Sequence, residues 1–151
     1  MAPALNIRSA RLSDAPRLAA LSGMLGYPQP AERLAATLER VLARGSEVVL
    51  VAESDPGLVI GWLHGAEQEL LETGKCCEIL GLVVDAAHRG HGAGRALIAD
   101  IEEWAGARGI VRLSVRSNIV RVEAHPFYES MGFERVKTQH AYRKVIAKQS
   151  R

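Results

Sequence analysis

Apolar side chains recur at helical spacing in two stretches near the start of the chain. Leu18, Leu21 and Leu25 lie at positions i, i+3 and i+7, behind a segment at residues 13–16 that offers a capping aspartate and a first-turn proline. A corner at residues 26–30 follows, and its second proline suits the first residue of the next helix. The pattern predicts a short strand from Leu5 and then two helices. The apolar positions of the second helix are Leu34, Leu38, Val41 and Leu42.

The middle of the chain has the composition of β-strands. Residues 47–53 are rich in β-branched side chains, and a turn with proline and glycine at residues 54–57 separates them from a second apolar run at residues 58–66. This order predicts a hairpin. Residues 69–75 are polar enough for a connection, and residues 75–84 are predicted to form the next strand, so that two or three antiparallel strands follow the helical pair.

The clearest helical pattern begins at Gly92 and ends near Gly106. An alternating run at residues 110–115 then predicts a strand, so residues 78–115 form one β-α-β unit with a parallel pair of strands. The apolar positions of this helix are Leu97, Ile98, Ile101, Trp104 and Ala105.

The last part of the chain predicts one more helix, which ends before Gly132, and then one or two strands in the apolar and basic tail at residues 133–146. The chain therefore has a mixed α/β fold, and its 151 residues, 48% of them hydrophobic, suffice for one core and a single domain over residues 1–151. The apolar positions of this helix are Ala124, Phe127, Tyr128 and Met131.

Charge, cysteine usage and hydropathy exclude several classes of function. The net charge is only +2 and the basic residues are scattered, so we expect no nucleic-acid partner. Cys76 and Cys77 are adjacent in a predicted strand, where neighbouring side chains point to opposite faces, so neither a disulfide nor a metal site is expected there. The chain has no apolar leader segment and no apolar run of membrane-spanning length, so we expect a cytoplasmic protein without a membrane partner.

A glycine-dense turn joins the strand that ends at Val84 to the helix that begins after Gly92. Such a junction presents free backbone N–H groups at a helix N-terminus, and Arg95 in the first helical turn is favourable there only if an anion is bound as well. An ordinary glycine-rich corner is an equally good interpretation of the turn in isolation. No Gly-Lys-Ser/Thr follows the glycines, and Arg95 stands where a dinucleotide-binding fingerprint requires its third glycine, so the turn is neither a P-loop nor a Rossmann turn.

The turn, Arg89-x-x-Gly92-x-Gly94, is followed downstream by Asn118 and by the segment at residues 124–133, which contains Phe-Tyr-Glu-x-x-Gly-Phe. These two motifs and the order of elements resemble the GCN-five-related N-acetyltransferase (GNAT) superfamily along the whole chain. The resemblance implies a central mixed sheet of about six to seven strands flanked by four helices. It also implies acetyl-CoA as cosubstrate, no metal, a small-molecule or peptide amine as acceptor, and a possible homodimer.

The resemblance also assigns residues to the acetyl-CoA site. It implies that the pyrophosphate binds the backbone of the glycine turn and that the pantetheine arm runs along the end of the preceding strand, in a splay between this strand and residues 111–115. The implied cofactor-binding residues are Leu82, Val83, Val84, Arg89, Gly90, His91, Gly92, Ala93, Gly94, Arg95 and Asn118.

Acetyl transfer to an amine needs a proton acceptor, a polarised carbonyl and a proton donor for the leaving sulfur. Tyr128 stands at the family's position for the general acid, although its spacing alone favours a core aromatic residue. Glu78 stands where some members of the superfamily place a general base, and a solvent-facing role is about equally consistent with its pattern. The N–H of Val83 or Val84 would polarise the carbonyl.

Three further residues are candidates for the acceptor pocket by family position, and each is equally consistent with plain packing: Tyr27, Trp62 and His64. Pro126 departs from the family pattern: either it lies in the first turn of its helix, which tolerates proline, or it kinks the helix and changes the aim of Tyr128. The sequence thus predicts an N-acetyltransferase that works by direct attack in a ternary complex. A non-catalytic CoA-binding sensor or regulatory module is the alternative.

Overall fold

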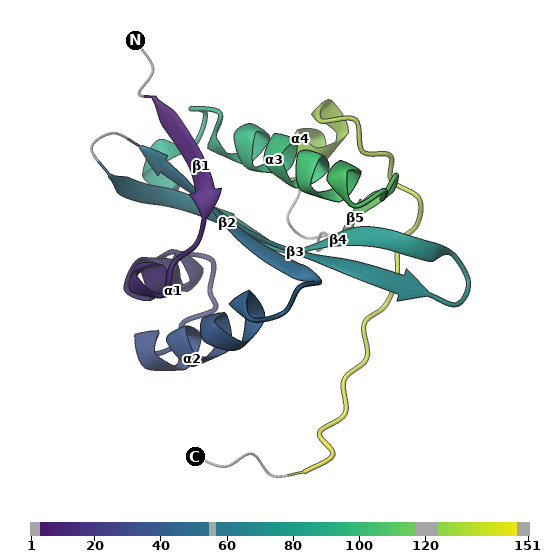
Figure 1. The fold of residues 1–151 in the computed structure, drawn as a ribbon, viewed down its shortest axis with the longest axis horizontal. Helices are drawn as coiled ribbons and strands as arrows, with labels where there is room; N and C mark the ends of the chain where they lie inside the picture. The colour runs from purple at the N-terminus through teal and green to yellow at the C-terminus, as the bar shows by residue number, and fades with distance from the viewer. Residues whose placement is uncertain (1–3, 55–56, 117–123, 148–151) are drawn as a thin grey trace. The chain divides into compact units, whose positions relative to one another are not determined.

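The computed structural model describes residues 4–54, 57–116 and 124–147, and the chain divides into two compact units, Met1–Arg116 and Ser117–Arg151. The first unit contains every strand found among the described residues together with three α-helices (Figure 1). Its elements are β1 (Leu5–Ser9), η1 (Leu12–Asp14), α1 (Ala15–Met24), α2 (Ala31–Leu42), β2 (Glu47–Ser54), β3 (Leu58–Leu70), β4 (Gly74–Val84), η2 (Ala86–His88), α3 (Ala93–Ala107) and β5 (Leu113–Val115). The second unit contains α4 (Ala124–Ser130).

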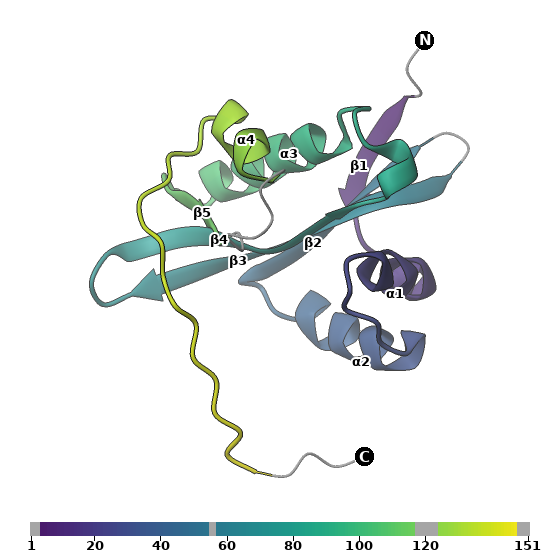
Figure 2. The same ribbon diagram turned by 180° about the vertical axis from the view of Figure 1, so that it is seen from behind.

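The sheet of the first unit has the strand order β1-β2-β3-β4-β5. Neighbouring strands are antiparallel except for β4 and β5, which are parallel and joined through α3. The β-α-β unit that the sequence predicted is therefore confirmed. Helices α1 and α2 cover one face of the sheet and α3 covers the other (Figures 1 and 2), which is the layered arrangement that buries the apolar stripes of all three helices.

Two apolar layers hold the helices to the sheet. On the α1/α2 face, Leu21 and Val51 are fully buried in a cluster that includes residues of both helices and of β2, β3 and β4. On the α3 face, Leu97 and Ile101 are fully buried. Helix α3 approaches β3 closely because Gly65 has no side chain: a Cβ there would lie 2.5 Å from Cδ1 of Ile101.

The first strand is tied to the first helix by an arginine with two carboxylate partners. Arg8 of β1 donates from Nη1 to Asp14 at 2.9 Å and from Nη2 to Glu53 at 3.0 Å. Asp14 precedes α1, as the sequence predicted, but its carboxylate accepts from Arg8 and from the backbone N–H of Arg11 and makes no capping bond to α1. The guanidinium of Arg8 is the main cause that holds the pKa of Asp14 below its usual value.

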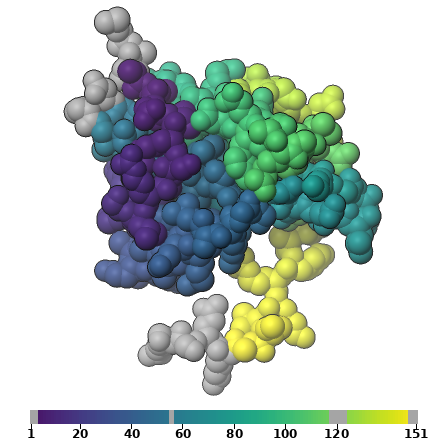
Figure 3. Space-filling model, viewed as in Figure 1, coloured from purple at the N-terminus to yellow at the C-terminus, as the bar shows by residue number. Residues whose placement is uncertain are grey.

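The β3–β4 hairpin is longer than the sequence predicted. The connection lies within the expected residues 69–75 but is shorter, because β3 continues to Leu70 and the pairing of Leu70 with Gly74 closes the hairpin with a tight turn. Polar side chains fit this extension because the tip of the hairpin reaches past the helices (Figure 3, teal), where ladder hydrogen bonds form while the side chains stay in water. Gly74 has φ +76°, a conformation that favours glycine.

The mixed sheet is present as predicted, but the described residues form five strands, slightly fewer than the expected six to seven. The expected strands at residues 133–146 are not among them. Val136, Tyr142 and Ile146 of this segment are between 83% and 93% exposed. A segment with alternating apolar and polar side chains forms a strand only where a neighbouring strand supplies the backbone hydrogen bonds.

Candidate active site

Strand β4 is paired with β5 along only part of its length. The parallel pairing covers only Cys77–Leu113, Glu78–Ser114 and Ile79–Val115, whereas β4 continues to Val84. Within the described part of the chain, the backbone of residues 80–84 therefore has no strand partner on the β5 side. The splay that the family resemblance implied at this point stays a prediction, because all three residues of β5 are paired with β4.

A β-bulge lies directly after Ile79, the last residue of β4 that is paired with β5. On the β3 side, His64 pairs with Gly81 and Gly65 pairs with Ile79, so Leu80 is an extra residue in β4. A bulge of this kind bends the strand and re-aims the residues beyond it. Leu82, Val83 and Val84 follow the bulge and remain paired with β3, whereas no described strand pairs with the opposite edge of their backbone, which we call the open edge of β4. An extended ligand that carries amide groups can bind such an edge as an added strand.

The glycine turn follows this open edge directly. Gly90 has φ +83° and Gly92, the N-cap of α3, has φ +85°, conformations that L side chains adopt only with strain. The first helical hydrogen bond runs from the N–H of Ala96 to the carbonyl of Gly92 at 2.9 Å. The N–H groups of Ala93, Gly94 and Arg95 precede that bond and have no acceptor within the helix, so they present positive potential to an anion.

Three basic residues surround the glycine turn. Arg89, His91 and Arg95 are all exposed beside the N-terminus of α3. The rings of His88 and His91 lie edge to face, with their centroids 6.2 Å apart. The turn thus combines unpaired N–H groups with exposed cations, which is the arrangement that a phosphate or pyrophosphate requires.

Asp85 holds the start of the glycine turn in place, a role that was not predicted from the sequence. Its carboxylate accepts from the N–H of Ala87 at 3.0 Å and from Nη2 of Arg17 in α1 at 2.9 Å, while Nδ1 of His88 lies 3.4 Å away. These contacts, led by the backbone bond from Ala87, hold the pKa of Asp85 below its usual value. An aspartate directly after a strand is a cap signal that could have indicated the local bond, whereas the partner in α1 is visible only in the fold.

Glu78 and His64 lie on the α1/α2 face of the sheet, near the bulge. Trp62 belongs to the apolar cluster of that face, and His64 shares its face by the alternation of β3. Glu78 is paired directly with Ala66, the next residue on the same face, so it points to this side as well. The side chain of Glu78 is 13% exposed, and one of its oxygens lies 3.3 Å from Nε of Arg116.

Two more of the predicted acceptor residues differ in their surroundings. The ring of Trp62 lies against Gly81: a Cβ at Gly81 would be 2.8 Å from two of its ring carbons. The indole Nε1 of Trp62 is buried and has no hydrogen-bond partner among the described residues. Tyr27, in the corner between α1 and α2, is 71% exposed. The side chain of Trp62 is thus packed against the sheet, and its indole N–H is buried without an acceptor among the described residues. The side chain of Tyr27, by contrast, is accessible from solvent.

Tyr128 belongs to the second unit and is described within it. Its ring meets those of Phe127 and Phe133 edge to face, with centroid distances of 5.3 and 5.7 Å. Pro126 is the third residue of α4, in the first turn, where proline is tolerated. The predicted ligand Asn118 lies outside the described residues.

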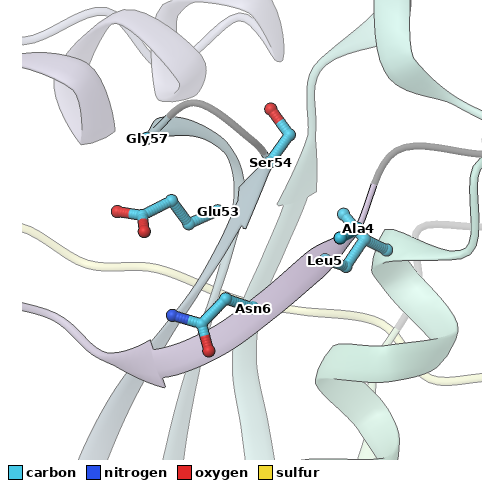
Figure 4. Close-up of a pocket in the computed structure, with 6 residues that line it drawn as sticks. All are labelled: Ala4, Leu5, Asn6, Glu53, Ser54 and Gly57. Atoms are coloured by element: carbon cyan, nitrogen blue, oxygen red, sulfur yellow. The ribbon is translucent and has the colours of Figure 1, made fainter.

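A separate hollow of about 200 Å³ lies at the β1 edge of the sheet (Figure 4). It is lined by Ala4, Leu5, Asn6, Glu53, Ser54 and Gly57, none of which is a predicted site residue. Glu53 is already bound to Arg8 there. We therefore assign no chemistry to this hollow.

The described residues offer no alternative centre for metal or thiol chemistry. No group of three or more His, Cys, Asp or Glu side chains among them could hold a metal ion. Both cysteines are buried and free, and burial is the main cause that raises the pKa of the Cys77 thiol to about 11. Cys77 is therefore a protonated thiol at neutral pH and a poor nucleophile. No described helix is both long and apolar enough to cross a membrane.

The first unit thus combines a mixed sheet, a bulge in β4 and a glycine turn at the N-terminus of α3. The model of the acetyltransferase (GNAT) family matches residues 14–133, and the chain belongs to this family. The family assignment that the motifs suggested is thereby confirmed.

Individual relatives agree with this assignment. The probable N-acetyltransferase family 8 member 5 of Mus musculus is 33% identical over 86 residues, which are 56% of this chain and 37% of the relative, so the match spans little more than a third of that protein. An aminoglycoside 6'-N-acetyltransferase from Acinetobacter baumannii has a similar structure, with a TM-score of 0.84, 18% identity and coverage of 95% of this chain and 100% of its own. An aminoglycoside N-acetyltransferase in complex with CoA has a TM-score of 0.85, 20% identity and coverage of 95% and 97%.

Proposed function

We propose that this protein is an N-acetyltransferase that moves an acetyl group from acetyl-CoA to a primary amine by direct attack in a ternary complex. The observation that carries the proposal is the continuity of the open edge of β4 with the N-terminus of α3. A structurally similar aminoglycoside N-acetyltransferase in complex with CoA supports the choice of cosubstrate. Membership in the acetyltransferase (GNAT) family supports the reaction.

The residues present suit two parts of acetyl-CoA, its pyrophosphate and its pantetheine arm. The N–H groups of Ala93, Gly94 and Arg95, together with the cations of the turn, suit the pyrophosphate. The open backbone of Leu82, Val83 and Val84 suits the amide groups of the pantetheine arm, with Asn118 as a further donor or acceptor. Acetyl-CoA supplies the acetyl group as a thioester, which an amine attacks.

The transfer needs three groups from the protein. Glu78 takes a proton from the attacking amine, directly or through a water, as the C–N bond forms. A backbone N–H of Val83 or Val84 polarises the carbonyl, and Tyr128 donates a proton to the sulfur as the C–S bond breaks. A phenol suits the last role because its usual pKa near 10 keeps it protonated at neutral pH.

The acceptor is a small-molecule or peptide amine that enters over the α1/α2 face. Tyr27, Trp62 and His64 would line its path, and the 71% exposure of Tyr27 supports a ligand contact there. Aminoglycoside acetyltransferases among the similar structures support a small-molecule acceptor. A homodimer and a cytoplasmic location are further expectations, and size-exclusion chromatography with light scattering tests the first.

The decisive experiment measures the release of free CoA thiol from acetyl-CoA with a panel of primary amines. We expect amine-dependent release, and we expect Tyr128→Phe to lower kcat about 100-fold because it removes the proton donor. Tyr142→Phe is the matched control, since Tyr142 is 93% exposed and should retain wild-type kcat. Unchanged turnover in Tyr128→Phe would contradict the assignment of the acid.

A binding measurement separates the enzyme from the alternative, a CoA-binding sensor. Acetyl-CoA at 100 times its Kd should stabilise the folded state by about 2.7 kcal/mol in either case. Stabilisation without thiol release by any amine would favour the sensor. Absence of both would exclude the CoA site itself.

A further inference from the structure

A glutamate–histidine pair lies beside the proposed base on the α1/α2 face. Nε2 of His64 in β3 is 2.8 Å from Oε1 of Glu47 in β2, and Oε2 of Glu47 accepts from Nη1 of Arg44 at 2.8 Å. The side chains of Glu47 and His64 are 12% and 25% exposed. Both carboxylate oxygens are therefore committed, in a pair that is largely shielded from water.

Glu47 determines which ring nitrogen of His64 carries the proton. Burial by itself would raise the pKa of Glu47, but the hydrogen bonds from Arg44 and His64 outweigh it and lower the pKa. An ionised carboxylate only accepts hydrogen bonds, so Nε2 of His64 must be the donor. In the neutral ring Nδ1 then carries the lone pair, and it has no hydrogen bond among the described residues. His64 is held as a proton acceptor through Nδ1.

The register of the sheet places this acceptor next to Glu78. Glu78 is directly opposite Ala66, and His64 is two residues from Ala66 on the same face, so Glu78 and His64 are diagonal neighbours on adjacent strands. Diagonal pairs lie roughly 7–8 Å apart at the backbone, a gap that a glutamate, an imidazole and one water can bridge. His64 is also the more exposed of the two side chains.

We propose that His64, positioned by Glu47, relays to solvent the proton that Glu78 takes from the amine. This inference rests on the proposed function, which requires Glu78 to lose that proton before each new turnover. The proton passes from the carboxylic acid of Glu78, through a bridging water, to Nδ1 of His64, and the imidazolium then releases it to bulk water. Glu47 stabilises the imidazolium while it exists, and Arg44 keeps Glu47 in place.

Chemical rescue of a histidine deletion tests the relay. With saturating acetyl-CoA and amine, we expect His64→Ala to lower kcat about 10-fold or more, with the KM for acetyl-CoA unchanged. Added imidazole should restore a large part of kcat, because a free ring can occupy the vacated space and accept the proton. His140→Ala, a change at an exposed histidine in the tail, should retain wild-type kcat and show no response to imidazole.

Glu47→Gln is the second variant, and it leaves the imidazole in place. The amide can donate to Nε2 and so favours the wrong tautomer, and we expect kcat to fall several-fold without a change in the melting temperature that would explain it. Wild-type kcat in His64→Ala, a loss that appears only in the KM for the amine, or a folded variant that imidazole does not rescue would each overturn the relay. Absence of acetyl transfer by the wild-type protein would instead refute the proposed function.

Discussion

Single glycines determine the geometry of the proposed pyrophosphate site. Gly90 and Gly92 both have φ above +80°, and an added Cβ at either would meet nothing within 4 Å. The requirement for glycine is therefore conformational and not steric. Gly92 is also the N-cap of α3, so its backbone directs the first free N–H groups of the helix.

Gly92→Ala should weaken CoA binding because a left-handed alanine costs about 1–2 kcal/mol relative to glycine. Relaxation of that strain would turn the N–H groups away from the anion, and we expect the Kd for CoA in calorimetry to rise about tenfold. Gly106→Ala is the matched control in the same helix, where φ is not positive and nothing lies within 4 Å of an added Cβ. It should stabilise the protein by about 0.5–1 kcal/mol and leave the Kd unchanged. Equal Kd values for both variants would refute this account of the turn.

The position of α3 depends on its contact with β3. Gly61 and Gly65 both lie under this helix, near Leu97 and Ile101 respectively. The absence of side chains at these positions lets the helix lie close to the sheet. Because α3 carries the free N–H groups, this packing also sets the distance between the turn and the open edge of β4.

Gly65→Ala should destabilise the protein by about 1–3 kcal/mol, because the new Cβ would overlap Cδ1 of Ile101. Ile101→Val removes that methyl group and alone should cost about 0.5–1.5 kcal/mol. We expect the double variant to be more stable than the sum of the two single effects predicts, as measured by urea unfolding. Strict additivity would show that the overlap is relieved elsewhere.

At the scale of the whole molecule, three carboxylates join different elements of the first unit. Asp14 links β1 to the start of α1, Glu47 links the start of β2 to β3, and Asp85 links the end of β4 to α1. The pKa of each is lowered in the folded protein. A carboxylate with a lower pKa in the folded than in the unfolded state stabilises the fold at neutral pH, and this contribution is lost as the pH falls through the folded pKa.

Stability should therefore fall on acidification below about pH 4.5, where the carboxyls of the unfolded chain begin to bind protons. Asp14→Asn should lower the free energy of unfolding at pH 7 by about 1–3 kcal/mol, because Arg8 loses a charged partner. The difference from wild type should shrink toward pH 2, where the wild-type carboxylate is also protonated. Urea unfolding across this range measures both effects. Glu102→Gln, at an exposed position of α3, is the control, and its free energy of unfolding should change with pH as that of the wild type does.

The order of the elements could be predicted from the sequence because each depends on nearby residues. Helical stripes, the turn at residues 54–57 and the proline of α1 are local signals, and the predicted helices and the parallel β4–β5 pair are present. The glycine turn could also be predicted, because a strand, two glycines and a helix start are adjacent in the chain. The boundaries of the β3–β4 hairpin could not be predicted, because a polar segment forms a strand when the backbone of its partner strand supplies the hydrogen bonds.

What the sequence determined by itself is a glycine turn at a helix N-terminus, together with the motifs that name the family. The tertiary structure decided that the pairing of β4 with β5 ends at Ile79, that Asp85 binds Arg17, and that Glu47 lies 2.8 Å from Nε2 of His64. It also left the tail without the strands that its pattern predicted. The physical reason is the same in each case, because strand pairing and ion pairs are interactions between different segments of the chain. The periodicity of apolar residues shows only which face of a single segment is to be buried.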